Sequence, residues 1–232
     1  MCSRYFLDAD GNVIAYAFRV PPDERIRPRF NIAPGQEAPV IRMSGQGARE
    51  SAMLRWGLVP AWAKDPSVGS RMINARSESA AQKPAFREAL RVRRCAVPAS
   101  GFYEWTGAPR HRIPHALRVE GEPLVAFAGL WERWLDVEGR ALETFTILTT
   151  AANERVARLH DRMPAILAPR EVEAWIAGTP QEAARLLQPY PADVMSEHSV
   201  SRSLNDSRIE PGRMPGADPA PGELWEDEPP QG

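Results

Sequence analysis

The sequence predicts an α+β fold, namely a single strand-rich domain with short helices at its periphery. Between residues 95 and 149 five apolar, strand-like segments follow one another, separated by glycine and proline turn signals. The helical patterns are short and lie outside this run. With 232 residues, 43% of them hydrophobic, and no internal repeat, the chain is long enough to bury one substantial core.

The strand predictions rest on short apolar runs between turn residues. The first half is expected to hold short strands within residues 3–20, around a turn at 8–12, and strands at 38–43 and 53–58. The second half is expected to hold strands at 95–98, 102–105, 116–119, 124–134, 142–149 and 163–167.

Helices are predicted at four places: residues 77–90, 154–159, 170–177 and 181–187. Ser77 or Ser79 can cap the first of them, and Pro84 limits that helix to its second half. Asn153 is expected to cap the second helix. Residues 60–76 are instead predicted to form an ordered loop, and loops of this length inside a compact domain are often functional.

The composition changes after Asp206, where proline, glycine and acidic residues take over. We expect a folded domain over residues 2–208 and a disordered acidic tail over 209–232. From residue 210 onward there are six acids and one base, so residues 1–209 carry a net charge of about +4. This is a weak indication of nucleic-acid binding by itself.

Several classes of protein and site are not favoured by the sequence. No apolar run approaches the roughly 18 residues that span a bilayer, and Asp8, Asp10 and Gly11 stand where a secretory signal would be apolar. Neither a phosphate-binding glycine loop, nor a serine nucleophile elbow, nor a zinc motif is present. We therefore expect a cytoplasmic monomer without cofactor or metal, in which Cys2 and Cys95 are free thiols and Cys95 belongs to the core.

Cys2 stands where removal of Met1 would make it the N-terminal residue. It would then carry a thiol and an α-amine on adjacent carbons. The amine can condense with an aldehyde to an imine, and the thiol can close a five-membered thiazolidine ring. The simpler interpretation is an incidental cysteine in a frayed terminus.

Three polar clusters could supply the groups that such a reaction needs. Asn74 and Arg76 follow an apolar pair, and they either orient a reacting group beside a phosphate or merely precede a helix cap. Glu104 shares a strand face with Phe102, which can desolvate its carboxyl and raise its pKa, unless it lies at an exposed edge. His160 follows a predicted helix and is either a general acid/base or a surface residue at the helix end.

Aromatic residues alternate with arginines in the same parts of the chain. Trp56, Trp62 and Trp105 occur among Arg4, Arg55, Arg71, Arg76 and Arg162. Stacking rings beside phosphate-binding guanidinium groups are typical of surfaces that bind single-stranded nucleic acid. For any one tryptophan, packing in the core is the alternative.

Seven short blocks appear in order and together resemble one family. They are MCSRY (1–5), RFNIAPGQ (29–36), RWGLVPAWA (55–63), INARSE (73–78), RCAVPASGFYEW (94–105), FAGLWE (127–132) and HDRMP (160–164). The chain thus resembles the SRAP (SOS-response-associated peptidase) family from residue 2 to about 206. Ser3 departs from the glycine that usually follows the cysteine, and the acidic tail lies outside the resemblance.

The resemblance implies a fold of curved sheets or a pseudo-barrel and a function on damaged DNA. Such proteins bind single-stranded DNA and react with abasic sites, where the N-terminal cysteine forms a stable thiazolidine that shields the site from cleavage and error-prone bypass. It implies association with the nucleoid or replication forks. The implied catalytic residues are Cys2, Asn74, Glu104 and His160, and the predicted DNA-binding residues are Arg4, Trp62, Arg76, Trp105, Thr149, Thr150 and Arg162.

Two other functions remain open. In an N-terminal-nucleophile hydrolase, Cys2 would attack a peptide or amide carbonyl with its own amine as base, and removal of Met1 would be the minimal form of that activity. In a non-covalent DNA-binding module, Cys2 would be incidental. A lyase side reaction is a further possibility, because an imine at an abasic site can eliminate the 3′ phosphate.

Overall fold

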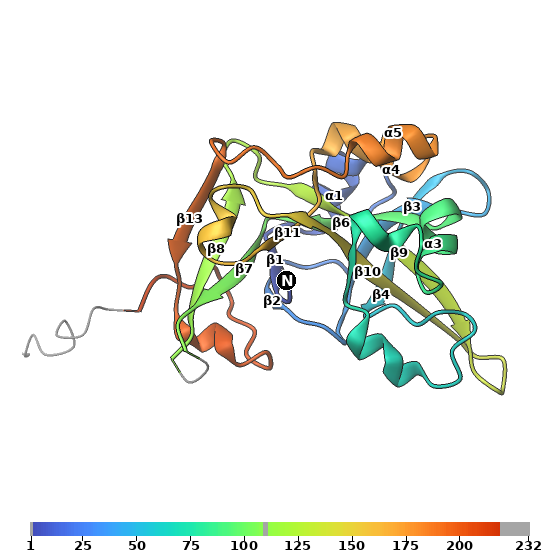
Figure 1. Cartoon of the computed structure of the whole chain (residues 1–232), viewed down its shortest axis with the longest axis horizontal. Helices are drawn as coiled ribbons and strands as arrows, with labels where there is room; N and C mark the ends of the chain where they lie inside the picture. Colours follow the sequence, from blue (N-terminus) through green and yellow to red (C-terminus); the bar gives the residue numbers. More distant parts are fainter. Residues whose placement is uncertain (1, 109–110, 219–232) are drawn as a thin grey trace, which may run out of the picture.

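The computed structural model describes residues 2–108 and 111–218, which form two sheets with short helices around them (Figure 1). The strands of the larger sheet are β3 (Glu37–Met43), β4 (Arg49–Trp56), β5 (Asn74–Arg76), β6 (Arg94–Ala99), β9 (Val125–Leu135), β10 (Ala141–Ala151), β11 (Arg162–Pro164) and β12 (Ile166–Leu167). The strands of the smaller sheet, in spatial order, are β13 (Met195–Ser199), β8 (Ile113–Val119), β7 (Gly101–Thr106), β1 (Tyr5–Leu7) and β2 (Arg29–Ile32). The predicted α+β class is confirmed.

Five strands of the larger sheet close into a barrel. Pairing runs from β10 through β4, β3, β6 and β9 and returns to β10. The closed path leaves these strands without a free edge, and their inward side chains fill the interior. Beyond the barrel, the final residues of β10 pair with β5 on one side and with β11 on the other. The segments that contain Asn74 and His160 are thereby brought to the same end of β10.

The smaller sheet packs on the barrel through β1, which lies centrally in Figure 1 between β7–β8 and the barrel strands. The ring of Tyr5 lies 5.3 Å from that of Trp56 and 5.8 Å from that of Phe127, edge-on in both cases. All three side chains are buried, so their contacts join the two sheets into one core. The indole N–H of Trp56 donates to the Ile73 carbonyl at 2.8 Å and fixes the chain just before Asn74.

The helices are short and peripheral, as predicted. They are α1 (Gly11–Phe18), α2 (Ser77–Ala80), α3 (Arg87–Val92), α4 (Val172–Ile176) and α5 (Pro180–Arg185), with 3₁₀ turns η1 (Pro66–Arg71), η2 (Val156–Arg158), η3 (Pro169–Glu171) and η4 (Arg202–Asn205). The helix expected at 77–90 is two helices, with Pro84 in the break between them. Among the residues that the structure describes, no helix is both long and apolar enough to cross a membrane.

The prediction of strands throughout residues 3–20 is wrong after Leu7, because α1 follows. The Asp10 carboxylate accepts the backbone N–H groups of Asn12 and Val13, which caps this helix. Ile14 and Phe18, four residues apart, are both buried on one helix face. The capping aspartate is also a common turn residue, so it favoured the turn prediction equally.

Three strands are missing from the prediction: β2, β13, and β5, which lies within the loop predicted at 60–76. The sequence of β13, Met-Ser-Glu-His-Ser, lacks the apolar alternation of a half-buried strand. It exists because each of its residues pairs with one in β8. Backbone pairing at a sheet edge is a tertiary effect that local composition does not report.

The predicted loop at 60–76 contains η1 and β5 but is otherwise irregular. Gly57 has a φ of 127°, and a Cβ there would lie 2.7 Å from the carbonyl oxygen of Gly69. A Cβ at Gly69 would lie equally close, 2.6 Å, to the Gly57 oxygen. The two glycines therefore let the ends of the segment that carries Trp62 touch through their backbones.

Residues 209–218, which we expected to begin the tail, include contacts with the domain. Glu210 accepts the Phe30 backbone N–H at 2.5 Å and lies 3.4 Å from the Arg29 guanidinium. Residues 219–232, most of the predicted tail, lie outside the described part of the chain. The boundary at residue 208 stays a prediction.

Candidate functional site

Cys2 lies just before β1 and is fully buried. The Asn74 carboxamide, at the start of β5, donates from Nδ2 to the Cys2 carbonyl at 2.7 Å. Its Oδ1 is buried and accepts no hydrogen bond from any described residue. Asn74 therefore holds the backbone of Cys2 and keeps a hydrogen-bond acceptor on the same carboxamide.

The Cys2 thiol is shielded from water and lies 3.8 Å from the Arg4 carbonyl oxygen. Burial, and then the negative charge of Glu104, raises the pKa of this thiol above its ordinary value. The thiol is therefore protonated at neutral pH. It can act as a nucleophile only after a base has removed its proton. Cys95 is also buried, as predicted for a core thiol.

Glu104 stands in β7 directly across from the segment that contains Cys2. The Tyr103 N–H donates to the Arg4 carbonyl at 3.0 Å, which continues the β1–β7 pairing toward Cys2. Glu104 is only 4% exposed, so of the two alternatives that the sequence left open, the buried carboxyl is the one observed. Burial raises the pKa of its carboxyl to about 7, and the charge of Asp161 acts in the same direction. Near neutral pH the group can both take and give a proton.

The two faces of β7 are as the strand alternation predicts. The rings of Tyr103 and Trp105 lie 6.4 Å apart on one face. Phe102, on the face shared with Glu104, packs against Phe127 with 6.1 Å between ring centroids. The carboxyl of Glu104 is thus desolvated on the core side of the strand.

His160 follows η2 and is partly exposed. Its Nδ1 accepts the backbone N–H of Arg162 at 3.0 Å and also lies 2.7 Å from a carboxylate oxygen of Asp161. The first contact requires a neutral Nδ1 and the second a protonated one. Burial lowers the pKa of His160, and Asp161 opposes that shift. The ring is therefore placed where either protonation state has a partner.

Arg76 and Arg162, both predicted to bind phosphate, differ in their surroundings. Arg76 is exposed at the end of β5. Arg162 is buried, forms two hydrogen bonds of 2.7 and 2.8 Å with the Glu78 carboxylate, and donates to the Thr149 carbonyl at 2.6 Å. The ion pair connects α2 to β11, so Arg162 stabilises the site whether or not it also contacts DNA.

A cavity of ≈260 Å³ opens beside the N-terminal segment. Its lining residues are Ser3, Arg4, Trp105, Arg112 and Asn205. The Arg4 guanidinium lies 5.7 Å from the centre of the Trp105 ring, and the indole N–H donates to the Asn205 side-chain oxygen at 2.8 Å. An aromatic ring beside a guanidinium group suits a base and a phosphate.

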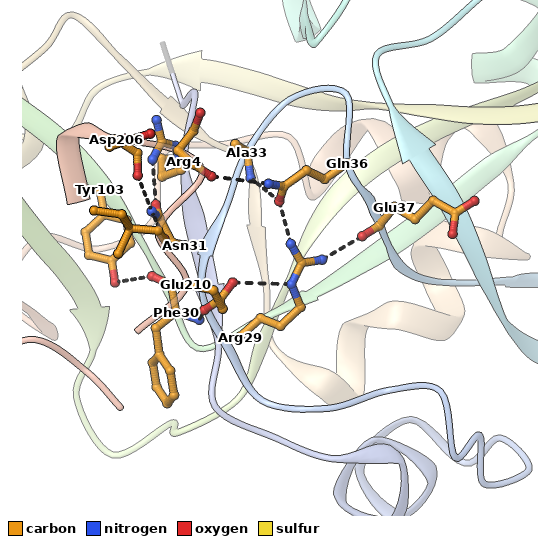
Figure 2. Close-up of polar contacts among 12 residues, drawn as sticks. Arg4, Arg29, Phe30, Asn31, Ala33, Gln36, Glu37, Tyr103, Asp206 and Glu210 are labelled. Atoms are coloured by element: carbon orange, nitrogen blue, oxygen red, sulfur yellow. Dashed lines mark hydrogen bonds and ion pairs between the residues drawn. The ribbon is translucent and has the colours of Figure 1, made fainter. Parts of the chain in front are cut away.

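A hydrogen-bond network holds the Arg4 side chain in place (Figure 2). Arg4 donates to the Asn31 side-chain oxygen at 2.5 Å and to the Leu204 carbonyl at 2.9 Å. Asn31 is itself buried and donates to the carbonyls of Asp206 and Ile209. The C-terminal segment is therefore bound against the strand that leads from Cys2 into the sheet.

The remaining predicted DNA contacts fall into two groups. Trp62 is 65% exposed, although its neighbours in the chain include buried core residues, so the surface position expected for a stacking residue is confirmed. Thr149 and Thr150 are buried, and the Thr150 hydroxyl donates to the Ala151 carbonyl at 3.0 Å. Their side chains offer no surface here, and their contact with DNA stays a prediction.

Sequence reasoning missed Asn31, Arg112 and Asn205. Asn31 lies in a block that the resemblance includes, between apolar neighbours, and that unusual position was its only signal. Asn205 and Arg112 meet in space through one hydrogen bond, from the Asn205 amide to the Arg112 carbonyl at 3.0 Å. They are 93 residues apart, so no local pattern connects them. Within residues 2–108 and 111–218 no cluster of three metal-ligating side chains occurs.

Comparison with known proteins gives a consistent assignment. The family model described as SOS response associated peptidase (SRAP) matches residues 1–207. The chain is 40% identical over 215 residues to the abasic site processing protein YoqW of Bacillus subtilis (strain 168), covering 90% of this chain and 96% of that protein. It is 32% identical to the abasic site processing protein HMCES of Gallus gallus, covering 79% of this chain and 64% of that protein.

Solved structures share the fold. The crystal structure of a protein from Bacteroides thetaiotaomicron superposes with a TM-score of 0.80 at 28% identity, covering 88% of this chain and 97% of that one. A second, from Bordetella bronchiseptica, gives a TM-score of 0.75 at 26% identity, covering 86% and 100%.

Proposed function

Because this chain belongs to the SOS response associated peptidase (SRAP) family, we propose that it binds single-stranded DNA and forms a covalent crosslink with abasic sites through Cys2. The names of its relatives support the handling of abasic sites. The observation that carries the specific proposal is the position of Cys2. Its backbone is held by Asn74, and the charge of Glu104 acts on its thiol.

The reaction needs no cofactor. Removal of Met1, which lies outside the described residues, frees the Cys2 α-amine. The amine attacks the aldehyde carbon of the opened sugar, and loss of one water gives an imine. The thiol sulfur then bonds to the imine carbon while the thiol proton passes to the imine nitrogen, which closes the thiazolidine. The crosslink shields the site from cleavage and error-prone bypass.

The raised pKa of the Cys2 thiol favours this order of events. An α-amine with a pKa of about 7.7–8.0 is partly unprotonated near neutrality, whereas the buried thiol is not ionised. The amine is therefore the first nucleophile, and the thiol follows once a base removes its proton. Glu104, with a pKa of about 7, is that base and also donates the proton on which water leaves.

His160 and Asn74 act on the two partners of the reaction. The Oδ1 of Asn74 accepts a hydrogen from the new α-amine and aims its lone pair at the aldehyde. His160 assists opening of the sugar ring by moving the proton of its hydroxyl, and it does the reverse during release. DNA is held by Arg4, Arg76 and the exposed Trp62.

An N-terminal-nucleophile peptidase or amidase is the second candidate, and the buried, protonated thiol disfavours it. Such an enzyme needs an activated thiolate or an amine that deprotonates the thiol before attack. Self-removal of Met1 and elimination of the 3′ phosphate would be side activities of the same groups. Thiazolidine closure suppresses the second, because it consumes the imine from which elimination occurs.

A denaturing gel tests the proposal. Single-stranded DNA with one abasic site is incubated with the wild-type protein and with Cys2→Ala. We expect a band that survives denaturation only for the wild type, because the alanine variant forms at most an imine that hydrolyses. A non-covalent complex, or a fast and stable crosslink by Cys2→Ala, contradicts the mechanism. Release of a peptide fragment without crosslinking supports the peptidase instead.

A further inference from the structure

Asp218, the last described residue, is bound near a cavity. The cavity is lined by Ser3, Arg4, Trp105, Arg112 and Asn205. The carboxylate of Asp218 accepts the backbone N–H of Arg202 at 3.0 Å. Arg202 begins the turn η4, and Asn205 ends it. A 3₁₀ turn rises about 2 Å per residue, so Asp218 is anchored about 6 Å along the turn from a residue of the cavity wall.

The chain before Asp218 already follows this face of the sheet. Glu210 accepts the Phe30 N–H, and the Met214 sulfur lies 3.5 Å from the Tyr103 hydroxyl. Tyr103 neighbours Trp105 on the same side of β7. The segment thus runs along the cavity side of the smaller sheet until Asp218.

The residues that follow have a composition that complements the cavity. Residues 219–232 contain Glu223, Glu226, Asp227 and Glu228, no basic residue, and the apolar pair Leu224–Trp225. An extended chain spans about 3.3–3.6 Å per residue, so Trp225 can lie up to about 24 Å from Asp218. The cavity is well within that reach.

The cavity offers a cationic and aromatic surface. The Arg4 side chain is partly exposed, and its guanidinium lies 5.7 Å from the centre of the Trp105 ring. Arg112 is exposed at the rim, and Trp105 provides a ring face. A carboxylate next to an aromatic side chain can pair with these groups as a phosphate next to a base would.

We propose that residues 219–232 dock in this cavity and compete with single-stranded DNA, so that the acidic tail is a built-in brake on the crosslinking site. The inference rests on the proposed DNA-binding function and adds its regulation. In this proposal the tail carboxylates substitute for phosphates beside Arg4 and Arg112, and the indole of Trp225 substitutes for a stacked base. DNA binds only in the fraction of molecules whose tail has left the cavity.

Deletion of residues 219–232 tests the competition. We expect the affinity for a short single strand without an abasic site to rise about tenfold, as measured by fluorescence anisotropy, because the competent fraction is no longer reduced. The gain should shrink as salt is raised, since ion pairs hold the tail. An unchanged affinity after deletion overturns the proposal.

Two variants of the same length separate docking from plain charge repulsion. Replacing the four tail acids by their amides should release the tail as deletion does. Trp225→Ala keeps every charge but removes the ring contact. It should therefore raise the DNA affinity by at least a third of the increase that the deletion produces. If Trp225→Ala leaves the affinity unchanged while the amide variant raises it, the tail acts only by repelling DNA and docking is refuted.

A binding measurement without DNA completes the test and is independent of the crosslinking chemistry. A labelled synthetic peptide of residues 219–232 is titrated with the chain truncated after Asp218. We expect saturable binding that Arg112→Glu weakens at least tenfold, and the exposed position of Arg112 makes that variant tolerable to the fold. Absence of binding, or binding that ignores Arg112→Glu, contradicts the proposal even if the crosslinking function holds.

Discussion

At the scale of single residues, Glu104 determines how the site responds to pH. It acts as a base only when ionised, and burial raises its pKa to about 7. The crosslinking rate should therefore rise from pH 5.5 to above pH 7, and further as the α-amine loses its proton near pH 8.

Glu104→Gln should remove the lower of these two rises and slow the reaction about 10²-fold or more. The measurement is the initial rate of adduct formation between pH 5.5 and pH 9 for both proteins. A variant whose profile keeps the rise near pH 7 would show that another group is the base.

The same shift makes Glu104 a cost to stability. Its folded pKa of about 7 lies above the value of about 4.3 in an unfolded chain, so between these values the unfolded state binds fewer protons and stability falls as pH rises. Glu104→Gln should therefore stabilise the protein at pH 8 by about 3 kcal/mol and leave it nearly unchanged at pH 4. Urea unfolding at the two pH values measures this. Equal effects at both would contradict the buried, titrating carboxyl.

Residue chemistry was also the level at which sequence reasoning was most successful. Strand alternation placed Glu104 on the face of Phe102, because that periodicity is local, and the structure decides between the buried and the exposed-edge alternatives in favour of burial. Asn205 and Arg112 could not be found in this way. They form the cavity wall only because η4 folds back on the start of β8, far away in sequence.

At the scale of elements, the Trp62 side chain on the loop 60–76 should contribute to DNA binding and little to folding. Its ring is 65% exposed, so Trp62→Ala should weaken binding of single-stranded DNA by about 1–3 kcal/mol through lost stacking. Tyr16→Ala is the matched control, because Tyr16 is 91% exposed on α1. Anisotropy titrations and melting temperatures of both variants distinguish the effects. If Trp62→Ala and Tyr16→Ala bound single-stranded DNA with equal affinity, Trp62 would not be part of the DNA-binding surface.

The ion pair between α2 and β11 should stabilise the end of β10. The Arg162 side chain holds the pKa of Glu78 down to about 2 by direct hydrogen bonds. Because the Glu78 side chain is 54% exposed, screening limits the expected loss in Glu78→Gln to about 1 kcal/mol at pH 7. A depressed carboxyl pKa stabilises the fold above pH ~4.3 and less as pH falls toward 2, so the loss should fade in acid.

Glu88→Gln provides the control for this prediction, since Glu88 and its partner Arg91 are both more than half exposed. We expect almost no change in melting temperature for that variant. An equal loss of stability at pH 7 in Glu78→Gln and Glu88→Gln would mean that burial of Arg162 does not strengthen its ion pair.

Element boundaries show which patterns the sequence encodes locally. The five barrel strands overlap the predicted segments, although β4 begins four residues before its predicted start at residue 53. The helix α1 was mistaken for strand, since aspartate, here the helix cap Asp10, is also a common residue in turns. The strand β13 was invisible because its pairing with β8 alone makes it a strand.

At the scale of the whole molecule, the fold brings distant segments to one short N-terminal stretch. Asn74 arrives from β5, Glu104 from β7, and His160 from the turn before β11. Closure of the barrel fixes β10, and β10 in turn places both β5 and β11. Sequence patterns predicted the class of this fold, but a closed path of strand pairings depends on long-range contacts that no local pattern contains.

The central claim is that the reacting unit is the Cys2 thiol together with its own α-amine. The most direct measurement is the intact mass of the protein after incubation with abasic single-stranded DNA. It compares the wild type with a version in which an N-terminal extension leaves the thiol present but the amine blocked. We predict loss of Met1 and a wild-type adduct that equals the sum of both masses less one water, and no adduct for the extended version. A stable adduct on the extended version would contradict the account.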